Sequence, residues 1–80
     1  MGKYINIVLA SECRSEKPER WAPAFRLVLY YGSVYEEPRG KFYAQDEKLT
    51  FKTQGEADRW ADSAARAWCA DHYPDWPISN

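Results

Sequence analysis

The fold is decided by the stretch TQGEADRWADSAARAW, which runs from Thr53 to Trp68. It opens with a capping box, in which Thr53 caps the first turn of a helix and Glu56 reaches back towards it. Glu56 and Asp58 also place negative charge in the first turn, where the helix dipole favours it. The stretch therefore predicts a helix that starts after Thr53 and ends before Pro74, near residues 71–72.

The predicted helix has two unlike sides. Its polar side holds Asp62 and Arg66, which are four residues apart in the favourable order for an ion pair. Its apolar side is rich in alanine, which lets a helix lie close to a sheet, and has tryptophan at the margins. This apolar stripe consists of Ala57, Trp60, Ala61, Ala64, Ala65 and Trp68.

Upstream of the helix, two segments alternate between apolar and other residues and predict strands, 4–10 and 24–31. The intervening residues 11–23 are polar, contain two prolines and lack a period, so we expect a long loop there. The second strand resumes at 34–35, and residues 37–40 form a turn. Residues 41–44 return as a third strand, and 49–51 form a fourth short extended piece or lead into the helix.

These elements predict one α+β domain spanning residues 1–80. Its expected architecture is an antiparallel β-meander of three to four strands, packed on one face by a single C-terminal α-helix in the order β-β-β-α. Thirteen aromatic residues give so short a chain enough apolar surface for a core. The expected core is Ile5, Ile7, Leu9, Phe25, Leu27, Leu29, Ala57, Trp60, Ala61, Ala64 and Trp68, and we expect Trp76 to fold back over it.

Charge and hydropathy exclude several classes of protein. No apolar run is long enough to span a membrane, and the start of the chain does not read as a signal peptide, so we expect a cytoplasmic protein. Residues 1–53 carry nine Lys and Arg against seven Asp and Glu, whereas residues 54–80 carry two against five. This mild asymmetry lacks the strongly basic footprint of a protein that binds duplex nucleic acid.

The residues that could carry chemistry do not form a complete site. Cys69 and His72 are three apart on the helix, and Cys13 could add a third metal ligand, but a structural zinc needs four. A Cys–His nucleophile would also need an orienting group and an oxyanion hole, and the sequence indicates neither. We therefore expect a reduced protein that is not an enzyme and has no cofactor or metal.

Binding is the function that the sequence favours. One helix covers one face of a sheet, so the other face is expected to expose aromatic and basic side chains. The loop 11–23 adds three candidates, with Trp21 either presented to a partner or packed over the end of the sheet. The predicted partner-binding residues are Tyr4, Arg14, Arg20, Trp21, Arg26, Tyr30 and Tyr43, with Val8 and Val28 exposed beside them.

The residues expected on this sheet face are compatible with more than one kind of partner. A host protein or a protein–nucleic acid complex is the leading interpretation, and a homodimer would also cover an apolar face. An aromatic and basic sheet face is also what single-stranded nucleic acid stacks on, which makes a nucleic-acid-binding domain the alternative.

The segment Phe51-Lys52-Thr53-Gln54-Gly55-Glu56-Ala57 joins a strand end to a capped, alanine-rich helix. Together with the aromatic-rich meander and the single helix, it resembles small proteins encoded by bacteriophages and mobile elements, anti-CRISPR proteins among them. The resemblance concerns the architecture and no specific motif. It implies an inhibitor in the host cell cytoplasm that occludes a host nucleoprotein such as a CRISPR-Cas effector.

Overall fold

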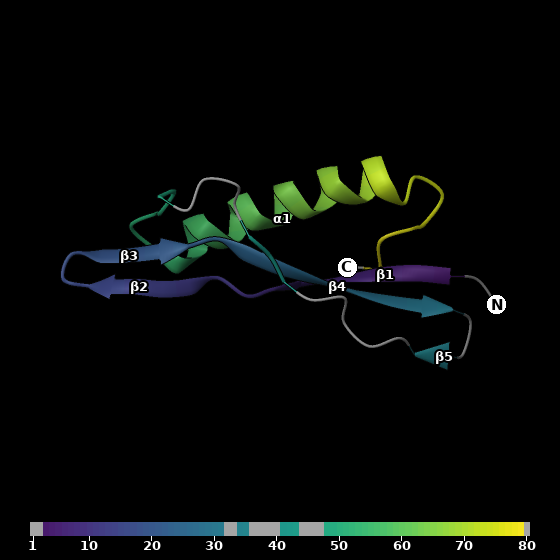
Figure 1. Cartoon of the computed structure of the whole chain (residues 1–80), viewed down its shortest axis with the longest axis horizontal. Coiled ribbons are helices and arrows are strands. Elements are labelled where there is room, and N and C mark those ends of the chain that lie inside the picture. The colour runs from purple at the N-terminus through teal and green to yellow at the C-terminus, as the bar shows by residue number, and fades with distance from the viewer. Residues whose placement is uncertain (1–2, 32–33, 36–40, 44–47, 80) are drawn as a thin grey trace.

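The structure, a computed structural model, describes residues 3–31, 34–35, 41–43 and 48–79. In chain order the elements are β1 (Lys3–Leu9), β2 (Glu12–Glu16), β3 (Glu19–Ala22), β4 (Ala24–Tyr31), β5 (Val34–Tyr35), β6 (Lys41–Tyr43) and α1 (Gln54–His72). Figure 1 shows a sheet with the single helix lying along one face. The predicted α+β fold, with four antiparallel strands followed by one C-terminal helix packed against them, is confirmed. The turn expected at 37–40 lies outside the described residues.

The first 29 described residues form one long β-hairpin, so the prediction of a loop at 11–23 is wrong. β1 pairs with β4 and β2 pairs with β3, and one register runs from Lys3↔Tyr31 to Cys13↔Trp21. Between the two halves the Ala10 amide donates to the Ala24 carbonyl at 2.9 Å. Ser11 and Pro23 then fall at a non-hydrogen-bonded position, where a residue without an N–H does not interrupt the pairing.

Residues 11–23 show no regular period of polar and apolar residues, although most of them form the paired strands β2 and β3. A bulge between Cys13 and Ser15 shifts the register by one residue and hides the alternation that marks a strand. The β2–β3 half of the hairpin projects beyond the first turn of α1 and gives the molecule its 48 Å length (Figure 1).

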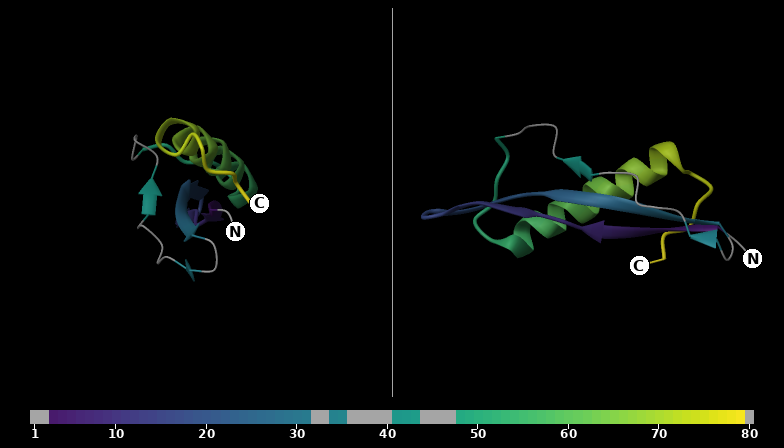
Figure 2. Two further views of the ribbon diagram at one scale, coloured as in Figure 1. Left: turned by 90° about the vertical axis from the view of Figure 1, so that its right-hand side faces the viewer. Right: turned by 60° about the horizontal axis from the view of Figure 1, so that its bottom comes forward.

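β4 is the central strand of the four-stranded sheet. β1 pairs with one edge of β4, and the short strands β5 and β6 pair with the other, all antiparallel. Figure 1 shows β5 on the side of β4 away from β1, and the left view of Figure 2 shows β6 on that side as well. Phe51 forms an isolated antiparallel bridge with Trp21, with backbone distances of 2.8 and 2.9 Å, so the short extended piece expected at 49–51 belongs to the sheet structure.

The helix follows its sequence signals closely. The Thr53 hydroxyl accepts a hydrogen bond from the Glu56 amide and is also 3.2 Å from the Glu56 carboxylate, to which it donates. Asp62 and Arg66 form the predicted ion pair at 3.0 Å. At the C-terminal end, the Tyr73 amide donates to the Cys69 carbonyl at 2.7 Å, and Pro74 follows.

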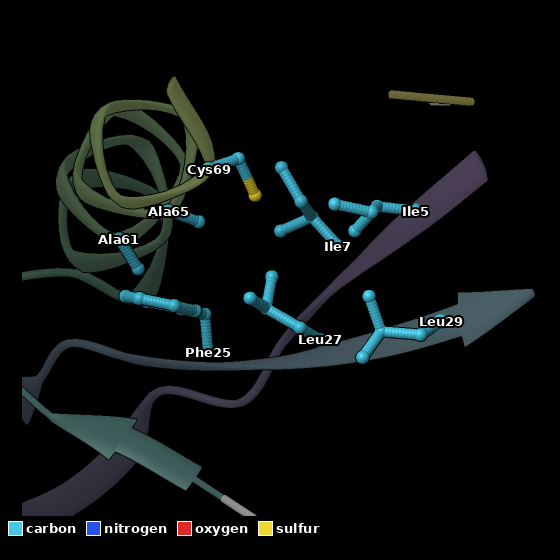
Figure 3. Close-up of a cluster of buried hydrophobic side chains, with 8 residues drawn as sticks. All are labelled: Ile5, Ile7, Phe25, Leu27, Leu29, Ala61, Ala65 and Cys69. Carbon is cyan, nitrogen blue, oxygen red and sulfur yellow. The ribbon is translucent and has the colours of Figure 1, made fainter. Parts of the chain in front are cut away.

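The core lies between α1 and the β1–β4 pair (Figure 3). The sheet contributes alternate residues of two neighbouring strands, and the helix contributes every fourth residue. The central cluster is Ile5, Ile7, Phe25, Leu27, Leu29, Ala61, Ala65 and Cys69, with Ala64, Trp68 and Trp76 partly buried against it. The expected return of Trp76 to the core is therefore confirmed.

Two residues placed in the core by sequence are exposed instead. Trp60 is 37% exposed because the buried side of α1 runs through Ala57, Ala61 and Ala65, which leaves Trp60 at the margin. Leu9 is 39% exposed because it ends β1, an edge strand that has a neighbouring strand on one side only.

Candidate protein-binding surface

The face of the sheet opposite α1 is built by alternation along β1 and β4. Because the odd-numbered residues of both strands point to the helix, the even-numbered ones point away from it. The register brings them together in directly opposed pairs. We call this surface the helix-free face, and it consists of Tyr4, Asn6 and Val8 from β1 and Arg26, Val28 and Tyr30 from β4.

Tyr4 and Tyr30 dominate one end of the helix-free face. They are directly opposite in the register, and their rings stack with centroids 4.5 Å apart and an angle of 11° between planes. Both side chains are half-buried. The pair is a rigid aromatic ridge that stands on two neighbouring strands.

The rest of the helix-free face is partly open. Val8 is 44% exposed and lies opposite Arg26, which is half-buried. Val28 was expected to be exposed but is only 7% exposed. It sits in the middle of the central strand, with larger neighbours along the strand at Arg26 and Tyr30 and Asn6 opposite, so that their side chains shield it.

Three predicted binding residues lie on the projecting β2–β3 hairpin, which we call the arm. Arg14 is exposed and sits in the bulge. Arg20 is half-buried, and its guanidinium donates to the Glu19 carbonyl at 3.1 Å. Trp21 is half-buried as well, and its indole N–H donates to the Glu19 carboxylate at 2.6 Å. Trp21 is therefore held in place on the arm and does not stand free.

The predicted site residues form two groups. Tyr4, Arg26 and Tyr30 share the helix-free face, whereas the arm carries Arg14, Arg20 and Trp21. Trp21 and Tyr30 are nine residues apart on one extended segment, which separates them by about 30 Å. Tyr43 pairs with Ala24 through β6, and its side chain lies outside what the structure describes.

The three residues that could bind a metal or act as nucleophile and base lie in different environments. Cys69 faces the core and is 1% exposed, and burial raises the pKa of its thiol. His72 lies on the exposed surface of the helix end, stacked on Trp68 at 3.8 Å with its Nδ1 3.1 Å from the Trp68 carbonyl oxygen. Cys13 is a free, exposed thiol on β2. Among residues 3–31, 34–35, 41–43 and 48–79, no three His, Cys, Asp or Glu side chains gather as metal ligands would.

A second surface feature was not foreseen from the sequence. An open groove of about 840 Å³ runs beside α1. Its lining includes Phe25, Leu49, Trp60, Ala64, Trp68 and His72. The sequence carries a signal for this groove, because Trp60, Ala64 and Trp68 recur every four residues. The single apolar stripe expected from the sequence therefore consists of two neighbouring stripes, one buried and one that lines the groove.

No family model, curated protein or solved structure matches this chain in sequence or in fold. In the part of the chain that the structure describes, no helix combines the length and apolar character needed to cross a bilayer.

Proposed function

We propose that this chain is a small, non-catalytic protein-binding module whose partner contacts the helix-free face and the arm. The observation that carries the proposal is the stacked Tyr4–Tyr30 pair, which shares with a 44% exposed Val8 a sheet face that α1 does not cover. A rigid aromatic pair on the same face as an exposed apolar side chain and an arginine is a composition that protein interfaces favour.

A protein partner fits this face better than a nucleic acid does. Bases stack on the open faces of aromatic rings, and Tyr4 and Tyr30 each turn one ring face towards the other. Lys3, next to Tyr4 in the chain, has its ammonium group 5.0 Å from the centroid of the Trp76 ring. Arg26 is then the cation that the described part of this face offers, and the net charge of the chain is −1.

A binding role is also consistent with the positions of Cys69 and His72. The Cys69 thiol packs in the core, and His72 stacks on Trp68 at the helix end, so these two do not combine as nucleophile and base. Binding by occlusion requires only a stable surface. A host nucleoprotein of the CRISPR-Cas effector type, in the host cytoplasm, is the first partner to test, because the architectural resemblance implies one.

The experiment begins with the chain alone. Light scattering first separates a self-associating protein from a monomer that waits for a partner. Capture from the source host then identifies the partner, and titration calorimetry with the purified partner measures affinity. Tyr30→Ala and Trp21→Ala should each weaken the complex by about fivefold or more, which corresponds to roughly 1 kcal/mol for a central aromatic anchor.

Matched variants on other surfaces make the result decisive. Asp62→Ala and Arg66→Ala test the polar side of α1, and Trp60→Ala tests the groove. If these weaken a confirmed complex while Tyr30→Ala and Trp21→Ala do not, the binding face is on the helix and the assignment is wrong. If the chain instead binds oligonucleotides with an affinity that falls steeply with salt, it belongs to the nucleic-acid class.

A further inference from the structure

The groove beside α1 combines apolar walls with one polar end. Trp60 and Trp68 line it from the helix, and Phe25 lines it from β4 (Figure 3). The last turn of α1 adds Asp71 and His72, the two polar residues of its described lining. Because a helix rises 1.5 Å per residue, about 16 Å separates Trp60 from Asp71 along the axis. With a volume of about 840 Å³, the groove has the size of sites that hold small organic molecules.

Trp60 offers this groove a free aromatic ring. Its side chain is large and apolar, and the residue is 37% exposed. Among the described residues, no hydrogen bond or ring contact involves its indole group. Trp68, by contrast, already carries the His72 ring at 3.8 Å. An apolar molecule that covers Trp60 would therefore remove an unpaired ring from water.

The backbone supplies hydrogen-bond acceptors at the polar end of the groove. The Ala70 carbonyl has no helical donor, because the fourth residue after it is Pro74, which lacks an N–H. No backbone amide of the described residues donates to the carbonyls of Asp71 or His72. The helix dipole places negative partial charge at this end, and the exposed Asp71 carboxylate adds a full charge.

His72 presents an acceptor as well. Its Nδ1 lies 3.1 Å from the Trp68 carbonyl oxygen, which can only accept, so Nδ1 carries the hydrogen. In the neutral ring Nε2 is then an acceptor. No lysine or arginine is found among the described lining residues. Acceptors and negative charge thus converge on a place that lacks a cation.

We propose that this groove binds a small amphipathic amine, an apolar molecule that ends in one protonated amino group. The apolar body lies along Trp60 and Trp68, and the ammonium group donates to the Asp71 carboxylate and the carbonyls of the helix end. The groove is separate from the helix-free face and the arm, so this inference does not rest on the proposed function.

Other occupants match the groove less well. A carboxylate would meet Asp71 and the negative end of the helix dipole. A neutral apolar molecule would cover the tryptophans but leave the acceptors of the polar end to water. A lysine of a protein partner would bring the ammonium group on a short four-carbon stem, whereas Trp60 lies about 16 Å along the helix from Asp71.

The test is a two-dimensional NMR titration of the full chain at pH 8 and low ionic strength. The probe is 6-phenylhexylamine, and it should shift the Trp60 indole signal and the amides of residues 67–72. A dissociation constant of about 1 mM is expected for a ligand of this size.

Three control molecules separate the charge of the probe from its apolar body. 6-Phenylhexan-1-ol should bind about threefold more weakly, and 6-phenylhexanoic acid about tenfold more weakly, because each changes the charge at the helix end. N-acetyl-lysine methylamide, which has the ammonium group without the aromatic body, should not bind measurably.

Paired variants assign the two ends of the ligand. Asp71→Asn should weaken amine binding by about threefold and leave alcohol binding unchanged, because the carboxylate is exposed. Asp62→Asn, on the polar side of α1, should change neither. Trp60→Leu should weaken the amine and the alcohol alike, by about threefold or more. Thermal unfolding checks that all three variants remain folded.

Several results would overturn this inference. Equal binding of the amine, the alcohol and the acid would show an apolar surface with no preference for a cation. Amine binding that is undiminished in Asp71→Asn, or shifts that fall outside the groove, would place the ligand elsewhere. If the lysine derivative binds as tightly as the phenylhexylamine, a basic side chain of a protein is the occupant. Tyr30→Ala tests the helix-free face independently, so either proposal can fail alone.

Discussion

At the scale of single residues, the two cysteines of this protein lie in different environments. Cys13 is exposed on the arm, and Cys69 is at the centre of the core. Burial raises the pKa of the Cys69 thiol above its ordinary value near 9, and the Arg66 guanidinium opposes part of that shift. The burial of Cys69 therefore makes the stability of the protein depend on pH.

We expect Cys69 to make the protein less stable in alkaline solution. Well below pH 9 the thiol is neutral in both the folded and the unfolded chain, so its contribution to stability is complete. As the pH rises, the unfolded chain ionises first, and the free energy of unfolding falls until the pH passes the folded pKa. Urea unfolding from pH 7 to 10.5 should show a steeper fall for the wild type than for Cys69→Ala.

Cys13→Ser is the control for this measurement. Tyrosine and lysine ionise in the same pH range in every variant, so only differences between variants are informative. Cys13→Ser should keep the slope of the wild type. The same slope in Cys69→Ala would contradict the assignment of the pH dependence to the buried thiol.

At the scale of elements, α1 is held by small side chains on its buried side. Ala57, Ala61 and Ala65 are fully buried, and they bring the helix axis close to β1 and β4. There is no room for a larger side chain at such a position, because protein interiors are closely packed. The packing distance between helix and sheet is thus set by alanine.

We expect Ala65→Leu to destabilise the fold by about 1–3 kcal/mol through overpacking. Ala67→Leu is the matched control, because Ala67 lies on the same helix two residues away and is exposed. Its effect should stay within about 0.5 kcal/mol. Urea unfolding followed by circular dichroism measures both. Equal losses in the two variants would mean that the buried side of α1 has been misplaced.

The elements also show which parts of the fold were predictable. The helix could be predicted because its signals are local. Thr53 and Glu56 mark its start, and the alanine stripe recurs at helical spacing within the same element. The arm could not, because its bulge at residues 13–15 and Pro23 break the alternation that marks a strand, although its paired residues lie only three to ten positions apart. A shift of register by one residue changes which side chains share a face, so no single period runs through the arm.

The candidate binding surface could likewise be predicted only in part. Alternation alone placed Tyr4 and Tyr30 on the face without the helix, and the structure adds that they are directly opposed and stacked. The burial of Val28 depends on which strands meet in space. No sequence pattern carried that information.

At the scale of the whole molecule, segment 73–79 ties the end of the described chain to its beginning. Ile78 bridges Ile5, and Trp76 packs against the core. The Trp76 and Tyr73 rings form a T-shaped pair with centroids 5.6 Å apart, and the Lys3 ammonium is 5.0 Å from the centroid of the Trp76 ring. This closure covers part of the outer edge of β1, which would otherwise be open to wrong partners.

We therefore expect two tryptophans to differ sharply in their contribution to stability. Trp76→Ala should lower the free energy of unfolding by about 2 kcal/mol or more, because it removes a half-buried ring that contacts the core, Tyr73 and Lys3. Trp60→Ala removes the same side chain from the helix margin, where 37% of it is exposed, and should cost about 1 kcal/mol or less.

Urea unfolding at pH 7 measures both tryptophan variants, and light scattering follows their state of association. With its ring gone, Trp76→Ala should also release segment 73–79 more readily and leave the backbone of Ile5 unpaired for part of the time. That variant should then self-associate at concentrations where Trp60→Ala and the wild type do not. If Trp60→Ala lowers the free energy of unfolding more than Trp76→Ala does, packing in the groove beside α1 contributes more to stability than the C-terminal segment 73–79.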